Sequence, residues 1–367
     1  MKFHPVTVIG ALLTAVCIVP RGPAPAAQGG APDPGRPSLR TVEFLSDTYH
    51  VDRKYPSMLG PQSSQIVRLT DSETDELLWI TGFRAVMVGE DGVSPMSQEF
   101  MCHSNLDMNM RLHRRLLGLE RGAPDRVFTL SQGQQELVFP EGFGLPVLAS
   151  EAFKLTTQVL NLNEEGNEFR VRHKVAIDFI PDAETTMPMK PLFQVVANGL
   201  VLIDGADPYY DINEADPNIH GSGCLVGASA VSADHLLSDG QGRRFSGHWV
   251  VEPGRQVNHT NVTRIMNLPF DTTVHYIAVH LHPFAESLEL RDLTADRVVY
   301  RSEASATPGR IGLARVDYFS STEGVPLFRG HEYELTSVYQ NTSDAPQDSM
   351  AVMYLYTLDR EFRRPAP

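Results

Sequence analysis

Short runs of alternating apolar and polar residues, broken by Gly, Pro, Asn and Asp, dominate the chain from Gln65 onward. A period of two is typical of β-strands that bury one face. The clearest runs cover residues 77–89, 152–162, 169–179 and 192–203. Only residues 105–119 have a helical pattern. The pattern therefore predicts an all-β protein made of antiparallel β-sandwiches of the jelly-roll kind.

The chain of 367 residues is long enough for two such domains in tandem. Residues 180–191 contain three prolines and are the predicted boundary. We expect an N-terminal β-sandwich over residues 41–184 and a C-terminal one over residues 185–367. Residues 27–40 are rich in Pro, Ala and Gly, and a disordered lead is predicted there.

The first 26 residues have the pattern of a signal peptide. Lys2 gives a positive start, residues 6–19 are apolar, and Ala24 and Ala26 are small residues suited to cleavage. The apolar run is shorter than the about 20 residues that a membrane-spanning helix needs. We expect a secreted or periplasmic protein without a membrane span.

A formal net charge of -14 argues against nucleic acid or an anionic membrane as a partner. Once the leader with Cys17 is removed, Cys102 and Cys224 remain. In an oxidising compartment they are compatible with one disulfide, and their spacing does not decide whether it forms.

Two histidines lie two positions apart in residues 273–282, a stretch with the composition of a strand. Because side chains alternate along a strand, His280 and His282 point to the same face. Histidine is the commonest metal ligand. The pair alone is equally compatible with polar residues on an exposed face.

A second predicted strand, residues 348–357, places Met350, Val352 and Tyr354 on one face. A thioether is a poor ligand for hard cations and suits copper, particularly Cu(I). Methionine on a strand is also ordinary core material. Whether Met350 is a metal ligand or core material therefore depends on whether its sulfur lies within bonding distance of the two imidazoles.

The His280-Leu-His282 pair, Met350 and the lead-in from Trp249 to Arg255 resemble the copper type II, ascorbate-dependent monooxygenases, the family of peptidylglycine α-hydroxylating and dopamine β-monooxygenases. The resemblance covers roughly residues 191–362. It implies that His280, His282 and Met350 bind the copper that activates O₂. It also implies that Tyr354 lines the substrate site, and that a small molecule and an electron donor such as ascorbate are partners.

Two apolar residues depart from the peptide-hydroxylating branch of this family. Ala278 and Val352 stand where that branch has an Arg and an Asn that help to hold the substrate. We therefore expect that a C-terminal peptidyl-glycine is not the substrate.

The second copper site of the family is altered or lost in the N-terminal half. Cys102-His103 stands where the family has two adjacent histidines, and no histidine lies at residues 158–161. His103 is the weaker second-site candidate, and His173 substitutes for the missing residue only if the geometry differs. The nearby methionines form either a soft copper site or, as we favour, ordinary core.

Two functions follow from these residues. The first is an exported copper-dependent monooxygenase that hydroxylates a C–H bond of a small molecule. The second is a non-catalytic copper carrier or sensor on the same fold. Zinc is a third possibility, although methionine is an unusual zinc ligand.

Structural or exposed roles are expected for the remaining histidines, His220, His248 and His259. The chain has no Gly-x-Ser-x-Gly elbow and no P-loop, which argues against a serine hydrolase or a P-loop NTPase.

Overall fold

The structure is a computed structural model that describes residues 38–57, 59–72, 74–120, 122, 124–202, 236–238 and 244–365. The predicted signal peptide, most of the predicted lead, and the residues His220 and Cys224 lie outside the described residues.

The first half of the described chain contains eleven strands, one α-helix and two 3₁₀-helices: β1 (Arg40–Leu45), β2 (Tyr49–Val51), β3 (Gln62–Val67), β4 (Leu77–Gly89), η1 (Gln98–Phe100), β5 (Met101–Met108), α1 (Met110–Leu117), β6 (Arg126–Leu130), β7 (Glu136–Val138), β8 (Phe143–Leu148), β9 (Phe153–Val159), β10 (Phe169–Pro181), η2 (Asp182–Glu184) and β11 (Lys190–Asn198).

The second half continues with β12 (Val201–Leu202), β13 (Leu236–Ser238), β14 (Arg244–Ser246), β15 (Trp249–Val251), β16 (Gly254–Asn261), α2 (Thr263–Met266), β17 (Thr272–Leu281), β18 (Ala285–Asp292), β19 (Arg297–Ala306), β20 (Leu313–Val316), β21 (Phe319–Leu327), β22 (Tyr333–Asn341), β23 (Gln347–Ser349) and β24 (Ala351–Leu358).

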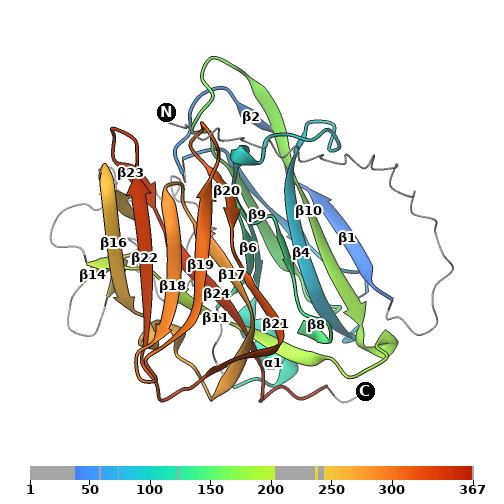
Figure 1. Ribbon diagram of the computed structural model, residues 1–367. Helices are drawn as coiled ribbons and strands as arrows, with labels where there is room; N and C mark the ends of the chain where they lie inside the picture. The colour runs from blue at the N-terminus through green and yellow to red at the C-terminus, as the bar shows by residue number, and fades with distance from the viewer. Residues whose placement is uncertain are drawn as a thin grey trace, which may run out of the picture. The chain divides into compact units, whose positions relative to one another are not determined.

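These strands form antiparallel sheets whose neighbours can be followed in Figure 1. In the first half, β1-β10-β4-β8 form one sheet and β3-β9-β5-β6 another. In the second half, β11-β24-β17-β21 continue the β1-β10-β4-β8 sheet, and β16-β22-β18-β19-β20 form a separate sheet. A short parallel pairing between β8 and β11 connects the halves through Lys190 and Pro191. The predicted all-β class and its antiparallel sandwich architecture are confirmed.

The predicted domain boundary remains a prediction. Residues 180–191 contain the end of β10, η2 and the start of β11. Pro37–Pro367 form one compact unit, and a division near residue 184 does not emerge from the contacts within it.

Strands β11, β24 and β17 are buried on both faces, whereas the edge strand β21 is largely exposed. Tyr276 and Ala278 of β17 belong to the core cluster that fills the first half, whereas Ile277 and Val279 belong to the core of the second half. A strand covered on both sides needs apolar residues at every position. This explains the continuous apolar sequence of β24.

Helix α1 is shorter than the predicted helix over residues 105–119. It begins at Met110, because the side chain of Asn109 accepts a hydrogen bond from Leu112 N and caps it. It ends at Gly118, whose φ of 62° is in the left-handed region. Residues 105–108 instead continue strand β5, and Leu106 is fully buried in the core.

Candidate metal centre

Strand β17 carries two of the three predicted copper ligands, His280 and, just after its end, His282. In the antiparallel register of β17 and β24, His280 is opposite Val352 and Leu281 is opposite Ala351. Directly opposed residues share a face, so His280 and Val352 point to the same side, and His282 follows two positions after His280. The pairing of β17 with β24 ends before Met350, where the Tyr339 hydroxyl accepts from His282 N at 3.4 Å and donates to Met350 O.

Each of the two imidazoles has a polar group next to its Nδ1. His280 Nδ1 lies 3.0 Å from Ser131 Oγ, and His282 Nδ1 lies 3.0 Å from Asp348 Oδ2. With the ring proton on Nδ1, a neutral imidazole carries its lone pair on Nε2. A carboxylate or hydroxyl next to the far nitrogen is the arrangement that orients histidine ligands in metal sites.

Both histidines line a small cavity between the two halves of the chain. Its walls include His280, His282 and Asp348 from the second half, and Cys102 and Ser131 from the first. The cavity has a volume of about 40 Å³. A water molecule needs about 10–15 Å³ by the same measure, so the space suits a few waters or an ion.

Burial favours the neutral form of His280. It holds the pKa of His280 well below its ordinary value, and His282, His103 and His248 lower it further. Burial alone raises the pKa of Asp348, but the neighbouring His282, His248 and Ser57 together outweigh burial and leave that pKa below its ordinary value. Neutral imidazole is the form that binds metal ions.

Tyr354, the predicted catalytic residue, lies in the core. It is 2% exposed and is paired in register with Ala278 and Val196. It is absent from the residues that line the cavity. Its predicted role at a substrate site remains a prediction.

Strand β5 positions the second-site candidate. The pairing of β5 with β9 shifts between Met101 and His103, so Cys102 is the extra residue of a β-bulge and lines the cavity. His103 itself is buried, which lowers its pKa well below the ordinary value, and Arg126 and His173 lower it further. The structure thus brings His103 into the surroundings of His282, which the sequence did not indicate.

Among the residues that the structure describes, no three His, Cys, Asp or Glu side chains are grouped so as to hold a metal ion. The predicted set of two imidazoles and one thioether contains only two residues of these types. A complete second site of the family's three-histidine kind is not found within the described part of the chain.

Sequence reasoning treated His248 as structural, and the structure places it next to the candidate site. The centroid of its ring is 6.0 Å from that of His282. One sequence feature could have indicated this position: His248 directly precedes Trp249, at the start of the segment that carries the family resemblance.

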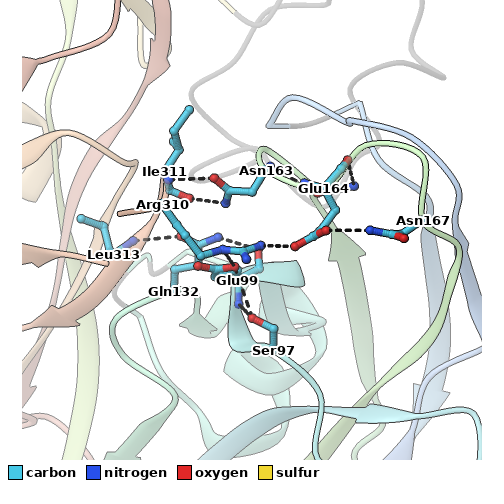
Figure 2. A network of polar contacts seen from close by, with 10 residues as sticks. Ser97, Glu99, Gln132, Asn163, Glu164, Asn167, Arg310, Ile311 and Leu313 are labelled. Carbon is cyan, nitrogen blue, oxygen red and sulfur yellow. Dashed lines mark hydrogen bonds and ion pairs between the residues drawn. The ribbon is translucent and has the colours of Figure 1, made fainter. Parts of the chain in front are cut away.

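A polar network braces the cavity wall that carries Ser131 (Figure 2). Arg310, in the turn between β19 and β20, forms ion pairs with Glu99 at 2.7 Å and with Glu164. Gln132 donates to Glu99 O at 2.7 Å and accepts from Leu313 N at 3.1 Å. The network therefore ties the residue next to Ser131 to the second half, which holds the Ser131–His280 contact in place.

His173, packed beneath this region, predicts a loss of stability in acid. Burial lowers its pKa to about 3, and Ser104 Oγ lies 2.8 Å from its Nδ1. The unfolded chain binds the proton near pH 6.5, so stability is complete above that pH and falls as the pH drops toward 3. From pH 7 to pH 5 the protonation of this one group lowers the free energy of unfolding by about 2 kcal/mol.

Urea unfolding at both pH values should show a smaller loss of stability for His173→Gln than for the parent protein. An equal loss would contradict the assignment of the acid sensitivity to His173.

Comparisons with known proteins find no family and only distant structural likenesses. No family model matches the chain, and no curated protein matches it. The structure of the STIV MCP is 9% identical, with a TM-score of 0.32, over 88% of this chain and 97% of its own. A peptide-N(4)-(N-acetyl-β-D-glucosaminyl) asparagine amidase is 8% identical, with a TM-score of 0.34, over 89% of this chain and 99% of its own. Within the described residues no helix is long and apolar enough to cross a membrane. The all-β sandwich architecture rests on the chain's own strand pairing.

Proposed function

We propose that this protein binds one copper ion outside the cytoplasm, through His280, His282 and Met350. The observation that supports the proposal is that His280 and His282 line one cavity together. Met350 does not line that cavity, and it directly precedes β24, the strand that pairs with β17. Imidazole suits several transition metals, and the thioether narrows the choice toward copper in its Cu(I) state.

The surroundings of the two rings support the proposal further. Ser131 and Asp348 next to the Nδ1 atoms leave the Nε2 atoms as metal donors. The buried Asp348 carboxylate offsets part of the positive charge of an ion in the cavity. Bound copper would supply reversible one-electron redox chemistry. The chain's own residues orient the rings, limit the access of water, and bring a negative charge close to the ion.

A second candidate, a copper-dependent monooxygenase that hydroxylates a small molecule, follows from the family resemblance. It fits the open positions that two imidazoles and a thioether leave on the ion. The cavity of about 40 Å³ has no room for an organic substrate, and Tyr354 does not line it. This geometry favours the binding role over hydroxylation.

Metal analysis followed by turnover assays separates these functions. The mature protein is loaded with Cu(I) under anaerobic conditions, passed through a desalting column, and assayed for copper by mass spectrometry. O₂ uptake is then followed with ascorbate and a panel of small substrates. We expect one tightly held copper per chain and no substrate-dependent O₂ uptake. Hydroxylated product would establish the monooxygenase instead, and failure to retain copper would refute both functions.

A further inference from the structure

We propose that an open groove beside Tyr318 binds an uncharged saccharide, with the ring of Tyr318 as the surface on which a sugar stacks. Among the described residues, this groove and the cavity at His280 share no lining residue. The proposal therefore stands apart from copper binding and does not depend on it.

The groove lies where a turn of the first half meets an edge of the second half. One side is formed by the turn after β6 and the start of β7, and the other by β19, β20 and the residues before β21. Val316 N donates to Gly133 O at 3.0 Å, which holds the two sides against each other. A Cβ at Gly133 would lie 2.7 Å from Val316 Cγ2, and the φ of Gly133 is 81°, so this approach requires glycine. The groove has a volume of about 620 Å³, which is that of an ordinary small-molecule site.

The ring of Tyr318 is exposed and yet held in place. Tyr318 is 53% exposed, and its ring is stacked on that of Tyr276, with centroids 5.3 Å apart and planes inclined by 18°. Tyr276 is fully buried, and its hydroxyl accepts from Gln134 Nε2 at 3.3 Å. Because one face of the Tyr318 ring is covered in this way, its exposed area is the edge and the second face. A ligand that stacks on that face meets a ring that is already ordered, which lowers the entropy lost on binding.

The groups around this ring suit a polyhydroxylated ligand. The C–H hydrogens on one side of a sugar ring carry a slight positive charge, which complements the negative face of an aromatic ring. Gln135 and Arg315 offer donors in the groove, and Glu136 and Asp317 offer acceptors. A hydroxyl group both donates and accepts hydrogen bonds, so neighbouring sugar hydroxyls can use both sets.

The charges that line the groove balance each other. Arg301 and Arg315 stand against Glu136 and Asp317. Arg315 pairs with Asp317 at 2.5 Å, and Arg301 pairs with Glu303 at 2.6 Å. A phosphate or carboxylate ligand would have to break these pairs and would approach two carboxylates, which costs free energy. The balance therefore favours a neutral ligand over a nucleotide or an acidic sugar.

Isothermal titration calorimetry with neutral oligosaccharides tests the proposal. The probes are cellohexaose, maltohexaose, xylohexaose, mannohexaose and laminarihexaose, each at up to about 10 mM, and we expect at least one of them to bind with a Kd of about 1 mM or lower. Tyr318→Ala should weaken that binding about tenfold, because it removes the stacking surface. Tyr318→Phe keeps the ring and should bind as the parent protein does. Leu293→Ala is the matched control, since it removes an exposed apolar side chain that does not line the groove.

Three outcomes would overturn the proposal. The first is that none of the five oligosaccharides binds to the parent protein. The second is that Tyr318→Ala binds as tightly as the parent, which would place the saccharide elsewhere. The third is concentration-dependent association of the parent in sedimentation velocity that Tyr318→Ala abolishes, which would make this surface a contact between two copies of the chain. Copper retention serves as a check that each variant is intact only where the parent retains copper, and circular dichroism serves in either case.

Discussion

We expect that replacing either His280 or His282 by Ala removes the proposed stoichiometric copper binding. Each substitution would delete one of the two proposed nitrogen donors, and the remaining groups would form too weak a chelate to retain the ion through desalting. We expect retained copper to fall from one per chain to less than about 0.1, since loss of even an outer partner of a metal ligand costs 10–100-fold in affinity. Mass spectrometry of the desalted protein measures this directly.

Two controls make this result specific. His259→Ala removes an exposed histidine and should retain the full amount of copper. Circular dichroism should show that both site variants remain folded, because each loses a polar side chain at the edge of a cavity and not from the centre of the core. Undiminished copper in folded His280→Ala and His282→Ala would contradict the proposed ligand set.

Deleting the Phe139 ring destabilises both halves of the chain together. Phe139 is 5% exposed and follows β7 in the first half. Its ring centre lies 4.9 Å from that of Tyr356 and 5.8 Å from that of Tyr276, both in the second half. Loss of a buried Phe ring costs about 3–5 kcal/mol through lost burial and the cavity left behind. Chemical denaturation of Phe139→Ala should show this loss.

The number of unfolding transitions also tests the predicted domain division. Because the Phe139 ring packs against residues of β17 and β24, we expect one transition that moves to lower denaturant. Val138→Ala is the adjacent control; Val138 is 44% exposed, and its truncation should shift the midpoint little. Two separate transitions, of which only one moves, would instead support independent domains divided near residue 184.

Much of the local structure could be predicted from the sequence, because side-chain alternation is a property of neighbouring residues. The apolar alternation of residues 77–89 matches β4, and the predicted strand over residues 273–282 differs from β17 by one residue at each end. The predicted helix was wrong in its first part. Residues 105–108 are apolar at alternate positions as well as at helical spacing, and the hydrogen bonds to β9 and β6 decided in favour of a strand.

The shared face of His280 and His282 could also be predicted, since side chains alternate along a strand with a period of two. The residues that surround the two imidazoles could not be predicted in this way. Ser131 is 149 positions from His280, and the ring centres of His248 and His282 lie 6.0 Å apart. Such contacts depend on which sheets pack together, and the pattern within a strand carries no information about that choice.

The sequence by itself determined the all-β class, most strand positions and the shared face of two histidines. Those properties arise from the alternation of side chains along an extended backbone, which any short stretch contains. Only the tertiary structure decided that Ser131 and Asp348 flank the two rings, that Tyr354 is buried away from the cavity, and that His248 lies next to His282. Each of these depends on packing between segments that are distant in the chain.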